Sequence, residues 1–144
     1  MGNQTHYFYA TRSETYMLTL FVVQSRADKL DPTTAVTSFH DLADEIYFVP
    51  NIHEINDKTK RNEWYAVIYD DEYIDEALKE GLKVFVKESD VDVLVLGKKT
   101  KDAIFKAPRL FRNNIKLSKQ SLMPEVGNLH TFETVLNGWI YDNN

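Results

Sequence analysis

The chain has 144 residues, of which 43% are hydrophobic and 27% charged, enough for one hydrophobic core and unlike a disordered or fibrous protein. We therefore expect a single domain over residues 1–144. No cysteine is present, which excludes disulfides, thiolate metal sites and cysteine nucleophiles. The formal net charge of −5 repels a phosphate backbone, so nucleic acid is not an expected partner.

The chain also lacks the patterns of export and membrane insertion. Residues 1–6 show no basic segment leading into an apolar stretch, and no run approaches the ~20 apolar residues that a bilayer-spanning helix needs. We expect no membrane span and a cytoplasmic location, with which the absence of cysteine is consistent.

The first half of the chain predicts a strand, a helix and a parallel strand. Residues 16–23 are a nearly continuous β-forming apolar run, typical of a strand covered on both faces. Asp31 and Pro32 then suit a helix start, and apolar residues at helical spacing continue to about residue 44. Residues 45–49 are β-rich and stop at Pro50. Residues 7–9 are either an edge strand or a packing arm, and the polar residues 51–62 are a predicted loop with at most one helical turn.

The second half predicts further alternation of strands and helices. Residues 64–69 predict a third strand, followed by a helix over residues 74–82 that closes near Gly81. Residues 84–86 and 91–96 predict two more strands, residues 107–117 are either a strand or irregular, and residues 129–136 predict a helix. Trp139 and its neighbours should pack back onto the core. The pattern predicts an α/β fold with a single open, mainly parallel sheet flanked by helices.

Two adjacent acids give the clearest candidate site. Asp70 and Asp71 follow the third predicted strand, and ligands of open α/β sheets bind at the carboxyl ends of the strands. Paired carboxylates can hold Mg²⁺ or Mn²⁺ while a bound diphosphate completes the coordination. The alternative, which spacing alone favours, is that Asp70, Asp71 and Glu72 only cap the next helix.

A second candidate lies further along, where Arg109 and Arg112 flank a large apolar pair. Two guanidinium groups so placed can anchor a phosphate by paired hydrogen bonds, or can simply point outward from a strand. The sequence leaves both interpretations open. Glycine-rich phosphate loops and nucleophile elbows are absent from the sequence.

Four segments together resemble the family 2 glycosyltransferases in order and motif. They are LTLFVVQSR (18–26), LADEIYFVP (42–50), WYAVIYDDEYIDEAL (64–78) and KAPRLFRN (106–113). The resemblance implies the GT-A fold, a Rossmann-like arrangement, in a shortened form. It also implies transfer of a sugar from a nucleotide sugar with inversion at the anomeric carbon.

The resemblance assigns roles to particular residues. Gln24, Arg26, Asn51 and Asp70 would contact the nucleotide, Asp70 and Asp71 would hold Mn²⁺ or Mg²⁺, and Arg109 and Arg112 would offset charge on the leaving group. The implied partner is a nucleotide sugar. A domain this short is what we expect in a phage genome, acting in the host cytoplasm.

The chain also departs from the family pattern. Tyr69 stands where the family has the first aspartate of its metal motif, residues 51–63 are shorter than the family's segment, and no catalytic base can be assigned. These departures favour an alternative function, a non-catalytic binding, inhibitory or virion-associated protein. Trp139 and the aromatic residues near the amino terminus leave a protein partner or homo-oligomer open, beside packing onto their own core.

Overall fold

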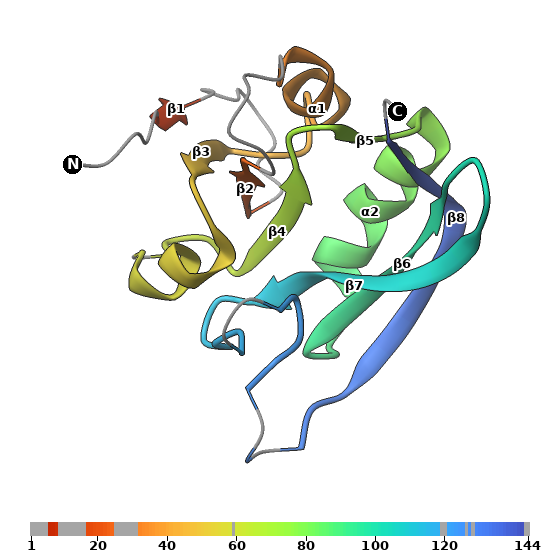
Figure 1. Cartoon of the computed structure of the whole chain (residues 1–144). Helices are drawn as coiled ribbons and strands as arrows, with labels where there is room; N and C mark the ends of the chain where they lie inside the picture. The colour runs from red at the N-terminus through yellow and green to blue at the C-terminus, as the bar shows by residue number, and fades with distance from the viewer. Residues whose placement is uncertain are drawn as a thin grey trace.

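The computed structural model describes residues 6–8, 17–24, 32–58, 60–118, 121–125, 127 and 129–142. In these ranges eight strands form one sheet in the order β1–β3–β2–β4–β7–β6–β8–β5 (Figure 1). The strands are β1 (His6–Phe8), β2 (Leu18–Val23), β3 (Glu45–Val49), β4 (Trp64–Tyr69), β5 (Glu72–Ile74), β6 (Val93–Lys99), β7 (Ile104–Arg112) and β8 (Phe132–Asp142). The helices are α1 (Thr33–Ser38), the 3₁₀ helix η1 (Ile52–Asp57) and α2 (Glu76–Glu88).

The sheet is mixed and curled, so the predicted open, mainly parallel, helix-flanked sheet of GT-A or Rossmann type is wrong. β2 pairs in parallel with β3 and β4, and β6 with β8. The pairs β1/β3, β4/β7, β6/β7 and β5/β8 are antiparallel. The strands curve into a half-barrel around α2 instead of forming a flat layer between two layers of helices (Figure 1).

The predicted strand–helix–strand unit at the start of the chain is confirmed. β2 and β3 run parallel, with Leu20 opposite Ile46, and all six side chains of β2 are buried. The helix between them is shorter than predicted because α1 ends at Ser38 and a turn, with Asp41 at φ 70°, leads into β3. β1 pairs with the far side of β3, as the edge-strand alternative predicted, while Tyr9 lies outside the described residues.

α2 runs through the residues where the sequence predicted a helix end and a strand. Leu78, Leu82 and Val86 recur every fourth residue and form its buried stripe. Gly81 does not end the helix, which continues to Glu88. A Cβ at position 81 would lie 2.8 Å from the Asn137 side chain, so a larger residue would not fit there. The glycine therefore serves close packing of α2 on β8, and the apolar residues 84–86 complete the same helix.

The predicted helix over residues 129–136 is also wrong, because β8 begins at Phe132 and continues to Asp142. The spacing of Phe132 and Leu136 imitates a helical period, yet both side chains are exposed. The register between β6 and β8 shifts between Leu96 and Gly97: Leu96 is paired with Val135, but Gly97 is paired with Trp139. Residues 136–138 thus form a bulge in β8, beyond which Ile140 is fully buried, as expected of an apolar terminus packed on the core.

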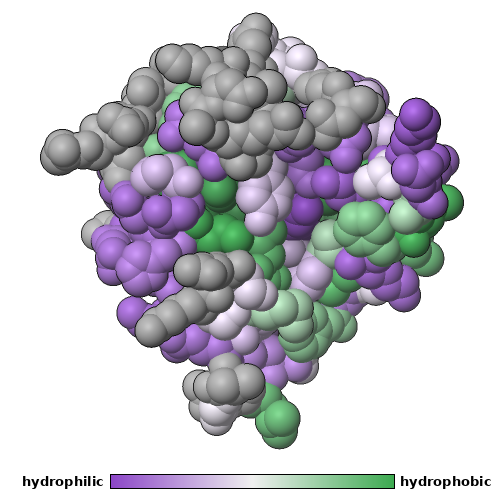
Figure 2. All heavy atoms as spheres, in the orientation of Figure 1, coloured by the Kyte–Doolittle hydropathy of each residue, from purple (hydrophilic) through white to green (hydrophobic). Residues whose placement is uncertain are grey.

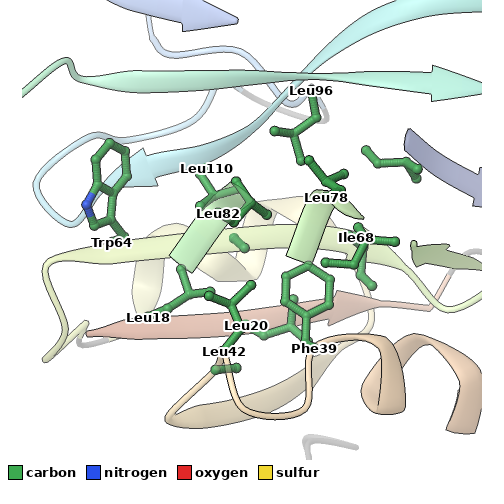
Figure 3. Packing of buried hydrophobic residues seen from close by; sticks show 14 of the residues in the cluster. Leu18, Leu20, Phe39, Leu42, Trp64, Ile68, Leu78, Leu82, Leu96 and Leu110 are labelled. Atoms are coloured by element: carbon green, nitrogen blue, oxygen red, sulfur yellow. The ribbon is translucent and has the colours of Figure 1, made fainter. Parts of the chain in front are cut away.

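Buried side chains cover both faces of the central strands. On one face, Leu78 and Leu82 of α2 lie between the side chains of β2 and those of β6 and β7 (Figure 3). On the other face, Phe21, Tyr65 and Phe111 pack with η1 and the segment after β7. Every helix in the described part of the chain is too short or too polar to cross a bilayer.

Candidate functional site

The carboxyl ends of three parallel strands bring several predicted site residues to one edge of the sheet. Gln24, Asn51 and Asp70 follow directly, or after one proline, from β2, β3 and β4. The backbone N–H of Gln24 donates to Val49 O at 3.0 Å, and that of Asp70 donates to Val23 O at 3.0 Å. Lateral hydrogen bonds thus continue one residue past the strands. Residues distant in sequence are thus brought to one edge of the sheet, where ligands of parallel strands bind.

The residues at this edge differ in how freely they face solvent. Gln24 is exposed, whereas Asp70 is only 5% exposed. Asn51 is exposed as well, but its side-chain oxygen accepts the backbone N–H of Glu54 at 3.1 Å and caps η1. Arg26 lies outside the described residues. The edge therefore presents two amide side chains and a largely covered carboxylate.

Asp70 and Asp71 offer hard oxygen atoms of the kind that Mg²⁺ and Mn²⁺ prefer. Within the described ranges, no group of three or more histidine, aspartate or glutamate residues lies close enough to hold a metal ion. The two aspartates therefore fit only an ion that draws most of its ligands from a bound diphosphate and water.

The acids after β4 do not cap the following helix, contrary to the alternative prediction. The N-cap of α2 is Asp75, whose carboxylate accepts the backbone N–H of Leu78 at 2.9 Å. Glu72 instead lies within β5 and is fully buried. Because Glu72 lies three residues before the N-cap, it is too far from the first turn of α2 to cap it.

Glu72 belongs to a buried ion-pair network beneath this edge. Its two carboxylate oxygens accept hydrogen bonds from Arg109 Nη1 and Nη2 at 2.6 and 2.8 Å. Lys98 Nζ donates to the same carboxylate, and the backbone N–H of Tyr69 donates to it at 2.7 Å. Burial acts to raise the pKa of Glu72, but the hydrogen bonds and charge of Arg109, with the hydrogen bond from Lys98, outweigh it and lower that pKa. Glu72 is therefore a carboxylate anion held by two cations.

The same network occupies Arg109, to which the family resemblance assigned the leaving group. Arg109 is buried, also donates to Val67 O at 3.3 Å, and lies with its guanidinium carbon 5.6 Å from the ring centroid of Tyr69. Its hydrogen-bonding groups thus face the protein interior. In this arrangement Arg109 supports the Tyr69 to Glu72 turn from below.

Arg112 lies at the opposite edge of the sheet from Asp70. It pairs in register with Trp64, the first residue of β4, and its guanidinium carbon lies 3.9 Å from the Trp64 ring centroid. Arg112 donates to the carbonyl oxygens of Val91 and Ser89 and forms an ion pair with Glu63 at 3.7 Å. The structure therefore does not bring Arg109 and Arg112 together around a common anion.

Sequence reasoning missed the Glu72, Arg109 and Lys98 network. The available signal was a charged residue, Arg109, within the possible strand 107–117; Lys98 follows Gly97 beyond the predicted strand 91–96 and gave no such signal. No protein-family model and no curated protein matches the chain.

Proposed function

We propose that the protein binds a nucleotide sugar at the carboxyl edge of β2, β3 and β4, with a divalent cation between the diphosphate and the aspartates after β4. The observation that carries the proposal is the meeting of Gln24, Asn51 and Asp70 at adjacent ends of three parallel strands. Amide and carboxylate side chains are suited to the hydroxyl and ring groups of a nucleoside, and strand ends are where such ligands bind.

The cation is part of the proposal for an electrostatic reason. The chain carries a net charge of −5, and the acids at this edge repel a diphosphate unless a cation lies between them. Arg109, the guanidinium nearest in the sheet, is already paired with Glu72. Binding should therefore depend strongly on Mn²⁺ or Mg²⁺.

Binding without sugar transfer is the function that these contacts favour. Of the two arginines assigned to the leaving group, Arg109 is buried in an ion pair and Arg112 lies at the other edge. A departing nucleoside diphosphate would lack both of these cations. A non-catalytic sugar-nucleotide-binding protein is thus the first candidate, and a metal-dependent glycosyltransferase, favoured by the adjacent Asp70 and Asp71, is the second.

Thermal unfolding with UDP, GDP and their glucose or mannose conjugates, with and without Mn²⁺, tests the proposal. A ligand at 100 times its dissociation constant adds about 2.7 kcal/mol of stability, which for a chain of this length raises Tm by about 9 °C. Asp71→Asn should abolish the Mn²⁺-dependent part of that shift. Asp102→Asn, a change of an exposed acid in the turn between β6 and β7, should leave the shift intact.

The binding protein and the glycosyltransferase can be distinguished by whether the bound nucleotide sugar is cleaved. Release of nucleoside diphosphate over hours, with the sugar passing to water or to an added acceptor alcohol, and lost in Asp71→Asn, would support the transferase candidate. A stable complex without release would support the binding protein. Should none of the nucleotides shift Tm in either condition, both candidates fail.

A further inference from the structure

Away from the proposed nucleotide site, large apolar side chains gather where the end of β6, the start of β7 and the middle of β8 lie side by side. Ile104 is 62% exposed, Leu136 is 85% exposed and Phe105 is 46% exposed. Figure 2 shows apolar surface beside hydrophilic side chains over this part of the molecule, at the right of the view. We call the residues around the cavity here the hairpin patch: Gly97, Ile104, Phe105, Lys106, Thr134, Leu136 and Trp139.

The hairpin patch surrounds a cavity of about 220 Å³. This is smaller than the ~300–1,000 Å³ of sites that enclose a drug-sized ligand. Its size suits a single apolar side chain, and the exposed residues beside it extend the apolar surface beyond the cavity. The shape thus favours a chain that inserts one anchor side chain and lies over the neighbouring surface.

The bulge in β8 builds one wall of this cavity. Residues 136–138 lie outside the β6/β8 pairing, which turns Leu136 to solvent and places Trp139 opposite Gly97. A Cβ on Gly97 would lie 2.8 Å from the Trp139 ring, so the indole rests directly on the glycine backbone. Bulges often redirect side chains at functional sites, and here the redirected residues are apolar and accessible.

The strand that lines one side of the cavity, β8, also has an unpaired edge. β5 pairs with β8 only over Ile140–Asp142, so in the described part of the chain no strand pairs with Phe132 to Leu136 on the side away from β6. Unpaired edge groups accept an added strand from an extended peptide. A peptide can place a side chain in the apolar cavity and also hydrogen-bond to the unpaired backbone of β8, whereas a small molecule can only fill the cavity.

Charge indicates which peptide fits. Lys106 lines the cavity and pairs with Gly97 across β6 and β7, while Lys99 Nζ lies 4.8 Å from the Trp139 ring centroid. Neither lysine has a carboxylate partner among the described residues. A second copy of the chain docked on itself here would oppose lysine to lysine, and an acidic partner would not.

We propose that the hairpin patch binds an extended acidic peptide segment of another protein, with one apolar side chain in the cavity and carboxylates beside Lys99 and Lys106. The proposal is independent of nucleotide binding. It uses neither the carboxyl edge of β2, β3 and β4 nor the aspartates there.

Three synthetic nonapeptides provide the probe: one phenylalanine flanked by four glutamates among glycines and serines, the same peptide with four lysines, and the acidic peptide with alanine as anchor. Amide chemical shifts of Gly97, Ile104 and Lys106 are followed in the full chain. The acidic phenylalanine peptide should shift these amides with a dissociation constant below about 1 mM, and the other two should bind at least about tenfold more weakly.

Variants localise the effect. Leu136→Ser and the double change Lys99→Glu with Lys106→Glu should each weaken binding about tenfold or more. Val84→Ser, which alters a half-exposed aliphatic residue on α2, should leave it unchanged. Because the altered side chains are at the surface, these variants should keep the wild-type Tm.

Several results would overturn the proposal. They are the absence of shifts up to about 1 mM peptide, equal binding of the lysine or alanine peptide, and equal binding to the Leu136→Ser variant. Shifts that appear on raising protein concentration without peptide would indicate a second copy instead. Shifts caused by an oligothymidine but by no peptide would assign the patch to single-stranded nucleic acid.

Discussion

Replacing Glu72 by glutamine should destabilise the fold more than any surface change. Glu72 is fully buried and neutralises Arg109 and Lys98. It also connects β5 with β7 and β6. Glutamine keeps the volume of the side chain but leaves the guanidinium in the interior without its counterion.

The size of the effect follows from that burial. Removing one member of a buried ion pair costs about 3–5 kcal/mol, because the other charge stays desolvated. For a domain of this length, about 0.3 kcal/mol corresponds to one degree, so Tm should fall by about 10–17 °C. In this variant Lys98 keeps one carboxylate partner, because its Nζ lies 3.7 Å from Asp142 Oδ2.

The dependence on pH has a definite sign. The pKa of Glu72 is lowered in the folded protein below its unfolded value of about 4.3. Its contribution to stability is therefore present above that unfolded pKa and is lost as pH falls through the lower folded pKa. Urea unfolding of wild type and Glu72→Gln should differ most at neutral pH, and the difference should narrow at pH values below about 4.

A double-mutant cycle isolates the pair. Glu72→Gln combined with Arg109→Met removes both charges, so the double variant should be less destabilised than the sum of the two single variants by about 2–3 kcal/mol. Glu80→Gln, which breaks the exposed pair with Lys83, should cost less than about 1 kcal/mol. Additive single changes, or a Glu72→Gln variant within about 1 kcal/mol of wild type, would refute the reasoning.

Three further predictions concern packing and hydrogen bonding. Gly138→Ala places a Cβ 2.2 Å from Asp75 Oδ1 and should cost more than about 1 kcal/mol through the α2 N-cap, measured as the urea midpoint. Leu82→Ala, at a fully buried site on α2, should cost about 2–5 kcal/mol in the same assay, and a smaller loss would contradict the packing described. Burial raises the pKa of Tyr65, whose hydroxyl donates to Ile115 O at 2.6 Å, so stability should fall as pH rises above the unfolded value of about 10. Tyr65→Phe should reduce this alkaline loss, and an unchanged pH profile in that variant would exclude Tyr65 as its source.

Part of the candidate site follows from sequence order alone. Residues 18–23 and 64–69 are continuous apolar runs, and they form the central strands β2 and β4 with the predicted bounds or nearly so. The predicted helix between β2 and β3, part of which is α1, makes a crossover long enough for β3 to run parallel to β2. Once these strands are parallel, Gln24, Asn51 and Asp70 must follow them at the same edge.

The interpretation of the charged residues depended on the sheet. Arg109 and Arg112 are three residues apart on one strand and seemed able to share a phosphate. The pairing of β4 with β7 places Arg112 at the start of β4, and Glu72 engages Arg109 from 37 residues away. A contact over that separation has no local pattern, because neither residue's neighbours specify its partner.

The sequence by itself determined the buried strands β2, β3 and β4 and the edge at which they end, because a strand covered on both faces requires consecutive apolar side chains. Only the tertiary structure decided the curl of the sheet, the full length of α2 and the strand conformation of residues 132–142. In those segments the apolar spacing suits a helix as well as a strand, and long-range pairing with β6 and packing on α2 select the conformation.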